Sequence, residues 1–381
     1  RTLEVQGNVS MANVTDAVGG ANMTLKLGGG NNQNFTQSNA TGIASPIQIN
    51  KSANTATLLT NMVAAQNVTV MAGTLSTGGF NITGAATKTF QVDNGAFFEM
   101  TGASTYPASF TTYTYGATST VRYAQNASLT VTNATYGHLE LKPSATALTF
   151  TVPATLNAIA GNLNIGNRTS YATAPIVTAA TNNTAITVRG DVTIANNITY
   201  TKAASGVFLF AKGATHTLTD STSGQDLGAV RISANTTNTT LNLGSSAKMT
   251  SLLIDLNQVF SHNGSNTLTL TGTGTPLTAT GTFTPSTGTV NYEGAGATTI
   301  TATTYNNLGA GTTSDAGAAV TYTLGGHTTV SGALTIGNAS STNSDTLDQG
   351  ATYNLTTGAV TVTSKGVWSN TGTGDVTLSG D

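Results

Sequence analysis

The chain is a succession of short segments, three to five residues long, in which apolar and polar residues alternate. Examples are Met-Thr-Leu-Lys-Leu at 23–27 and Val-Thr-Val at both 68–70 and 360–362. Alternation with a period of two is typical of a half-buried β-strand. Clusters of Gly, Asn and Ser, such as 28–32, separate these segments, and such clusters form turns. The pattern therefore predicts strands and turns in succession along the whole chain.

A degenerate internal repeat underlies this pattern. Its clearest copies consist of three matching segments, which are 121–123, 136–139 and 161–167 in the first copy and 290–292, 305–308 and 332–338 in the second. In each copy two tyrosines stand 13 positions apart, Tyr123 with Tyr136 and Tyr292 with Tyr305. Weaker matches extend the series to a repeat of roughly 85 residues, which indicates stacked units that bury their apolar faces against one another.

The repeat predicts one continuous array over residues 1–381. The least regular stretch is 103–120, which contains Tyr106 followed by a proline. We interpret 103–120 as a loop insertion.

Composition narrows the fold class to all-β. Asp, Glu, Lys and Arg make up only 7% of the residues, against about 25% in an ordinary soluble domain. Threonine is β-branched and favours strands, whereas the helix-forming residues Glu, Lys, Arg and Gln are scarce. The 43 glycines supply the tight turns that many short strands need.

Two all-β architectures are compatible with these strands. Very short strands, frequent turns and only 6% aromatic residues favour a right-handed parallel β-helix, a β-solenoid that forms an elongated rod. We expect coils of roughly 22 to 25 residues, stacked at the usual strand spacing. The alternative is a row of β-sandwich domains, which would have longer connections and a distinct aromatic core.

The best-defined part of the repeat resembles a known family. The resemblance is carried by segments 266–277, 288–294, 304–308 and 330–337. These resemble secreted bacterial surface proteins with degenerate parallel β-helix repeats, in the style of autotransporter passengers and filamentous adhesins. The resemblance implies a β-helical architecture and an extracellular or cell-surface location, and it implies no activity.

Charge and chain composition exclude several partners. The formal net charge is −2 and the 13 basic residues are scattered singly, so there is no electrostatic footprint for nucleic acid. No apolar run approaches the roughly 20 residues of a membrane span. The chain begins at Arg1, and we expect it to be a processed segment of a secreted precursor. The absence of cysteine excludes disulfides and thiolate sites.

Catalysis has little support in the sequence. Polysaccharide-cleaving enzymes need clustered carboxylates, but the acids here are dispersed. The close groupings are Asp220 with Asp226 and Asp345 with Asp348. Both lie in polar stretches, and we interpret them as turns or loops. We predict no enzyme and no catalytic residue, and a polysaccharide lyase or hydrolase is the least favoured function.

No metal or cofactor site is predicted. The four histidines, His138, His216, His262 and His327, lack the close spacing of metal ligands. We expect His138 and His327 to cap turns. The glycine-rich nonapeptide of calcium-binding β-helices does not occur, although isolated Ca²⁺ binding stays open.

Aromatic residues and sequons suggest contact with sugars. Trp368, Tyr106, Tyr113 and Tyr115 are candidates for stacking on sugar rings, although packing is the preferred interpretation. Asn-x-Ser/Thr sequons are frequent along the chain, and N-glycosylation is possible at some of them. The positions singled out are Asn8, Asn13, Asn67, Asn126, Asn167, Asn235, Asn263 and Asn354.

The ends of the chain suggest self-assembly. Neither end shows a charged or helical cap, and strand-like segments at both ends place Leu3, Val5, Val376 and Leu378 as assembly residues. We therefore predict a non-catalytic subunit of an extracellular filament, sheath or surface fibre that forms a head-to-tail homopolymer by stacking or strand exchange. The alternative is an adhesin or carbohydrate-binding surface passenger whose partners are surface glycans.

Overall fold

A computed structural model describes residues 1–11, 23–38, 42–166, 171–203, 205–222, 224–233, 237–313 and 318–379 of the 381-residue chain. The described residues form strands and turns, without an α-helix. Each strand pair whose register is defined is parallel, for example β1 (Thr2–Val5) with β3 (Thr24–Leu27). The prediction of a parallel β-solenoid is confirmed. Tandem β-sandwiches do not form, because their sheets would be antiparallel.

The chain separates into two compact units. The first comprises residues 1–182 with 188–190 and 197–199, and the second comprises 183–187, 191–196 and 200–381. Each unit is a β-solenoid in its own right. One continuous array over residues 1–381 stays a prediction from the sequence repeat.

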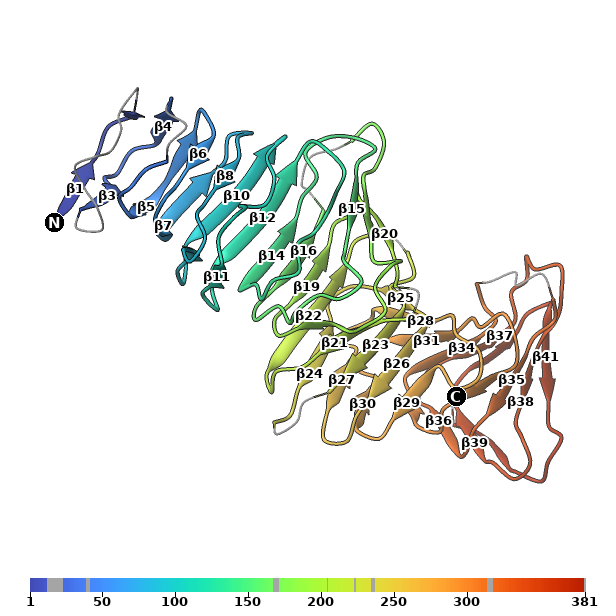
Figure 1. Ribbon diagram of the computed structural model, residues 1–381. Coiled ribbons are helices and arrows are strands. Elements are labelled where there is room, and N and C mark those ends of the chain that lie inside the picture. Colours follow the sequence, from blue (N-terminus) through green and yellow to red (C-terminus); the bar gives the residue numbers. More distant parts are fainter. Residues whose placement is uncertain are drawn as a thin grey trace. The chain divides into compact units, whose positions relative to one another are not determined.

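The first unit winds its coils through three parallel ladders of strands, which lie side by side in Figure 1. The first ladder contains β1, β3, β5 (Ile47–Leu58), β7 (Val68–Ser76), β9 (Thr89–Val92) and β11 (Thr112–Tyr115). The second contains β2 (Val9–Met11), β4 (Gln33–Gln37), the ends of β5 and β7, β10 (Phe97–Gly102), β12 (Thr120–Gln125), β14 (His138–Leu141) and β16 (Leu163–Ile165). The third side has two stretches, β6 (Met62–Val63) with β8 (Ile82–Thr83), and β13 (Leu129–Thr130), β15 (Thr149–Thr151) and β17 (Ile176–Thr178).

One turn of the solenoid takes close to the expected number of residues. Side-chain hydrogen bonds between consecutive coils commonly join residues 22 to 24 positions apart, as between Asn67 and Thr89 or Asn81 and Thr105. Four successive pairings along the second ladder lead from Leu75 to Leu163. The sequence repeat of roughly 85 residues thus corresponds to four coils.

The predicted loop insertion at 103–120 is wrong. Residues 112–115 form β11, which pairs in register with β9, and Thr120 begins β12. The coil from β10 to β12 is 23 residues long, as shown by the Arg122–Glu99 contact, so it has ordinary length. The segment looked irregular because its turn, 103–111, contains Tyr106 and a proline rather than the usual Gly, Asn and Thr.

A buried lysine marks the bend between the first two ladders. The pairing of β5 with β7 shifts register near Asn50. The side chain of Lys51 has no exposed surface there, and its Nζ donates to the carbonyl oxygen of Gly28 at 2.6 Å and to Gln33 Oε1 at 2.9 Å. Gly73 has a left-handed φ of 69°, and a Cβ on it would lie 1.9 Å from the carbonyl oxygen of Lys51. The bend therefore requires glycine at this position.

The second unit is built in the same way. One ladder contains β19 (Val192–Ile194), β22 (Thr215–Asp220), β24 (Thr240–Leu243), β27 (Val259–Ser261) and β30 (Thr282–Thr284). Another contains β21 (Val207–Phe210), β23 (Ala229–Ile232), β26 (Ser251–Ile254) and β29 (Leu277–Ala279). A third contains β25 (Ala247–Met249), β28 (Thr267–Leu270), β31 (Thr289–Tyr292), β34 (Asn307–Ala310), β37 (Leu334–Ile336) and β40 (Val360–Val362).

Two further ladders complete the later coils of this unit. One contains β32 (Thr298–Ile300), β35 (Thr321–Leu324), β38 (Asp345–Asp348) and β41 (Gly366–Ser369). The other contains β33 (Thr304–Tyr305), β36 (Thr328–Val330), β39 (Leu355–Thr357) and β42 (Val376–Leu378). Two short strands, β18 (Ile186–Val188) and β20 (Thr199–Thr201), contain residues of both units.

Polar side chains at the turns link each coil to the next. A side-chain oxygen in one coil accepts a hydrogen bond from a backbone N–H of the following coil, about one turn later in sequence. For example, Asn67 Oδ1 accepts from Thr89 N at 2.9 Å and Asn94 Oδ1 accepts from Thr118 N at 3.1 Å. The same contact recurs at Asn8, Asn32, Asn61, Asn81, Asn133, Asn307 and Asn354. Asparagine is abundant because it supplies partners for turn amides that no ladder pairs.

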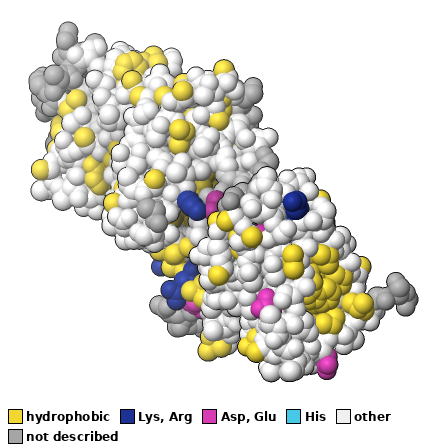
Figure 2. Space-filling model, turned by 90° about the vertical axis from the view of Figure 1, so that its right-hand side faces the viewer, with side chains coloured by type: hydrophobic (Ala, Val, Ile, Leu, Met, Phe, Trp, Pro, Cys, Tyr) yellow, Lys and Arg dark blue, Asp and Glu magenta, His cyan; other side chains and the backbone are white. Residues whose placement is uncertain are grey.

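The surface matches the composition. Figure 2 shows a face on which charged side chains are few, with scattered apolar side chains and one larger apolar patch. The apolar residues point inward along the ladders, as in β3, where Leu25 and Leu27 are buried and the flanking polar residues are not. This is the arrangement that the alternating sequence predicts.

Candidate functional site

The first pair of candidate acids closes turns, as expected. Asp220 Oδ1 accepts from Thr222 N at 2.9 Å and from Thr222 Oγ1 at 2.6 Å. Asp226 Oδ1 accepts from Gly228 N at 2.9 Å. Both are contacts to an amide two residues further on, a common way for aspartate to fix a turn.

The second pair differs from the expectation. Asp345 and Asp348 begin and end strand β38, so the predicted turn over these residues is wrong. The strand forms because Leu347 between them continues the buried apolar row through Tyr322. The turn starts only at Asp348, whose Oδ1 accepts from Gly350 N at 3.1 Å. Asp345 Oδ1 accepts from Val320 N in the neighbouring coil at 3.0 Å.

The surroundings move the pKa values of Asp220 and Asp226 in opposite directions. Burial raises the pKa of the Asp220 carboxyl, and the hydrogen bonds from Thr222 offset this only in part. Burial also acts to raise the pKa of Asp226, but hydrogen bonds from Lys202, Thr271 and the Gly228 amide outweigh it, so the pKa is lowered. The Lys202 ammonium lies 2.7 Å from Asp226 Oδ2. Asp226 is therefore an ionised structural carboxylate that holds neighbouring coils together.

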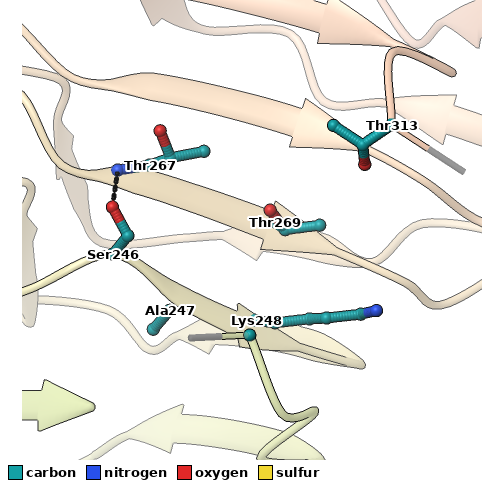
Figure 3. A pocket seen from close by; sticks show the side chains of 7 residues that line it. Ser246, Ala247, Lys248, Thr267, Thr269 and Thr313 are labelled. Atoms are coloured by element: carbon teal, nitrogen blue, oxygen red, sulfur yellow. Dashed lines mark hydrogen bonds between the residues drawn. The ribbon is translucent and has the colours of Figure 1, made fainter. Parts of the chain in front are cut away.

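A groove lies on the ladder β25–β28–β31 of the second unit (Figure 3). It consists of two adjoining hollows of about 390 and 430 Å³, which share Lys248, Thr269 and Thr313. The first is also lined by Gly224, Ser246, Ala247 and Thr267, and the second by Asp226, Thr271, Glu293 and Ala295.

Coil register builds this groove from residues that are far apart in sequence. Lys248 pairs with Thr269, and Thr269 pairs with Asn291, so their side chains form a row across consecutive strands. Thr267 N donates to Ser246 Oγ at 3.0 Å, which fixes one edge (Figure 3). No local sequence pattern predicts the groove, because its residues come from several coils.

One cation and several hydroxyl groups set the chemistry of the groove. None of the ion pairs in the described part of the chain includes Lys248, whose side chain extends along the groove in Figure 3. Glu293 Oε1 accepts from Thr312 N at 2.9 Å and from Thr313 N at 3.0 Å, so this carboxylate anchors a turn. The groove thus offers one ammonium group and threonine hydroxyls for hydrogen bonds to a polar ligand.

The histidines serve the scaffold. His138 Nδ1 accepts from Asn162 N at 2.8 Å and His327 Nδ1 accepts from Asn354 N at 3.0 Å, so the expected turn-capping role is confirmed for both. His216 and His262 are buried, and burial lowers the pKa of His262 to about 4. The described residues contain no cluster of three or more potential metal ligands.

The candidate sugar-stacking residues fall into two groups. Tyr115 stacks on the buried Tyr136 with 5.5 Å between ring centroids, and Trp368 pairs with the buried Leu347. Both therefore pack against the interior. Tyr106 and Tyr113 instead line a hollow of about 290 Å³ at the surface of the first unit.

The four predicted assembly residues lie in the outermost described strands of their ladders. Leu3 and Val5 are in β1, and Val376 and Leu378 are in β42. Exposure reaches 49% for Leu3, 40% for Val376 and 63% for Leu378.

The eight sequons singled out above are accessible where the structure describes them. The side chains of Asn8, Asn67, Asn126, Asn263 and Asn354 are exposed. Asn13, Asn167 and Asn235 lie outside the described residues. Glycosylation at these eight positions stays a prediction.

Comparison with known proteins gives no relative. No family model, no curated protein and no solved structure matches this chain. The described part of the chain contains no apolar helix of membrane-spanning length.

Proposed function

We propose that this chain is a non-catalytic structural subunit of an extracellular filament, sheath or surface fibre, in which copies join head to tail. The observation that carries the proposal is the exposure of core-type residues at the outermost coils. The proposal is also supported by the polar side chains named above, most of which form hydrogen bonds that link one coil to the next.

A single row of the first ladder illustrates this exposure. Leu3, Leu25 and Ile47 stand in register, and their exposed fractions are 49%, 6% and 0%. Leu3 has the same place in its coil as the buried residues, and it is exposed because no coil of the described residues covers it. Covering an apolar side chain of this size is worth roughly 1.5–3 kcal/mol.

The edge formed by β42 in the second unit is similar. Val376 and Leu378 continue rows that pass through Leu355 and Thr357, which are fully buried. Val362 in β40 and Val367 in β41, the last strands of two other ladders, are also more than 40% exposed. Each outermost strand also presents unpaired N–H and C=O groups, which are a template for another parallel strand. A contact between two different edges of one chain is heterologous, and it propagates into a filament when it does not close into a ring.

Self-association of the purified untagged chain tests the proposal. We expect sedimentation and electron microscopy to show fibres that lengthen with concentration. The variant Leu378→Asp places a charge in the proposed contact and should leave short species only. Leu256→Asp is the matched control, because Leu256 is 68% exposed in a turn away from the outermost strands. Monomers of the unmodified chain at high concentration, or equal effects of the two variants, would contradict the proposal.

A further inference from the structure

The turns of two consecutive coils in the first unit enclose a second, smaller hollow of about 230 Å³. It lies between the turn that follows β10 and the segment that follows β12. Its lining includes Ser104, Tyr106, Gln125 and Thr132. A single water takes about 30 Å³ in the liquid, so the hollow has room for more than one or two waters.

A buried amide with an unused acceptor lines this hollow. Gln125 is 2% exposed, and its Nε2 donates to the carbonyl oxygen of Ser104 in a long contact of 3.4 Å. Its Oε1 has no hydrogen-bond partner among the described residues. A buried acceptor without a partner costs about 1–3 kcal/mol. A ligand that donates a hydrogen bond to Oε1 would recover this free energy.

The hollow adjoins the one that contains Tyr113. Both hollows are lined by Tyr106 and Thr132, so they meet at these residues. The hollow that contains Tyr113 is also lined by Asn133, Ala134, Thr135 and Asn157. We call the two hollows together the Tyr106 groove.

Tyr106 is held rigidly within this groove. Its hydroxyl lies 2.5 Å from the Tyr115 hydroxyl, and its ring centroid lies 5.1 Å from that of Tyr113. Tyr113 is itself fixed by donating from its hydroxyl to the carbonyl oxygen of Pro107 at 2.8 Å. An aromatic ring that is already immobilised loses little conformational entropy when a ligand packs on it.

The described lining of the Tyr106 groove carries no charged side chain. It combines aromatic rings with hydroxyl and amide groups. Aromatic rings favour the apolar C–H face of a ligand, whereas hydroxyl and amide groups favour a ligand with many hydroxyls. A neutral pyranose presents both an apolar C–H face and hydroxyl groups. A strongly apolar ligand lacks the hydroxyl groups, and an anionic ligand carries a charge that no side chain in the described lining pairs.

We propose that the Tyr106 groove binds a neutral sugar unit of a glycan, with Gln125 Oε1 accepting a hydrogen bond from a sugar hydroxyl and the Tyr106 ring packing on the sugar face. The site is independent of assembly at the outermost coils. It gives this chain a glycan-contacting surface in addition to a structural role.

The test measures binding of the full chain to glucose, galactose, mannose and N-acetylglucosamine and to their short oligomers. Isothermal titration and saturation-transfer NMR are suitable, with polygalacturonate as an anionic comparison. We expect at least one neutral sugar to bind saturably and polygalacturonate to bind no better. Absence of saturable binding by every neutral sugar at millimolar concentration overturns the proposal.

Variants then locate the site. Gln125→Leu should weaken the bound sugar about five- to tenfold, the value of one hydrogen bond. Tyr106→Leu should weaken it at least as much, whereas Tyr106→Phe keeps the ring and should retain most of the affinity.

Gln349→Leu is the matched control, because Gln349 is also fully buried with an unpartnered Oε1, but it lies in the second unit. A folded Gln125→Leu variant that binds as well as the unmodified chain overturns the proposal. So does an equal loss of affinity in Gln349→Leu.

Discussion

Two coils, one in each unit, contain a buried tyrosine pair, Tyr123 with Tyr136 and Tyr292 with Tyr305. These two tyrosine coils have the same interior and different outer faces. In the first, Thr132 N donates to the Tyr123 hydroxyl at 3.2 Å, the two tyrosine hydroxyls lie 2.7 Å apart, and the Tyr136 hydroxyl donates to the carbonyl oxygen of Thr132 at 2.6 Å. In the second, Thr301, Tyr292 and Tyr305 repeat these contacts at 3.2, 2.8 and 2.7 Å. Both form a closed hydrogen-bonded ring.

Both tyrosine coils are 18 residues long, and this length explains the hydrogen-bonded ring. Arg122 and Glu140 are adjacent across the first coil and only 18 residues apart, and Asn307 and Thr289 are likewise 18 apart in the second. Such a coil is shorter than its neighbours, so the main chain of Thr132 or Thr301 lacks ladder partners. The tyrosine pair supplies a donor and an acceptor in their place.

The outward faces of the two coils differ. In the first, Arg122 lies between Glu99 at 2.9 Å and Glu140 at 2.6 Å, an ion-pair row across three strands. In the second, the positions of Arg122 and Glu140 are taken by Asn291 and Gly309. The difference teaches that the interior network defines the coil, whereas the outer face is free to change.

The largest expected effect comes from removing one aromatic side chain from either tyrosine pair. Tyr136→Ala and Tyr305→Ala each empty a fully buried site, and we expect a loss of about 3–5 kcal/mol in local stability. Native-state hydrogen exchange at the amides of Thr132 and Thr301 measures this free energy coil by coil. A loss below about 1 kcal/mol in one coil alone would show that the two interiors are not equivalent.

Acid should destabilise the second tyrosine coil more than the first. His262 lies beside Phe283, which contacts Tyr305, and its folded pKa of about 4 is below the usual 6.5. The unfolded chain therefore binds the proton first, and stability is full above pH 6.5 and falls as the pH decreases towards about 4, by roughly 3 kcal/mol. His262→Leu should flatten this pH dependence in thermal melts of the second unit. An unchanged pH profile in that variant would assign the acid sensitivity elsewhere.

Removing one hydroxyl should have a smaller effect. Tyr136→Phe and Tyr305→Phe each open the ring and leave a buried carbonyl oxygen and a buried tyrosine hydroxyl short of a partner, at a cost of about 1–3 kcal/mol. The two variants should agree within about 0.5 kcal/mol, because the rings have the same geometry. Hydrogen exchange at the same two amides gives the comparison, and unequal losses would limit the equivalence to packing.

The smallest effect should come from the outer face. Arg122→Asn removes the charge from the ion-pair row, and because the row is partly exposed we expect a loss of about 1 kcal/mol or less that shrinks in high salt. Asn291→Ala at the equivalent position should show no dependence on salt. Urea denaturation at low and high salt distinguishes the two. A loss as large as that of Tyr136→Ala would mean that the outer face also defines the coil.

Fold and site differ in how far the sequence predicts them. The alternation of short segments and the 13-residue tyrosine spacing were enough to predict a solenoid, because both depend on local patterns. The contacts of His138 with Asn162 and of Lys51 with Gln33 were not predictable in detail, because they depend on coil register about one turn away. Residues 345–348 and 112–115 resembled turns or loops in composition, and the buried rows made them strands. The groove that Lys248 lines and the Tyr106 groove likewise arise only when separate coils stack.

One mixing experiment tests the central claim, head-to-tail stacking through the outermost coils, most directly. Leu3→Asp blocks one edge of the chain and Leu378→Asp blocks the other, so each variant keeps one intact edge. Sedimentation velocity of an equimolar mixture should show a dimer that neither variant forms alone and no longer species, because only one intact contact can form. The same sedimentation for the mixture as for the separate variants would contradict assembly through these two edges.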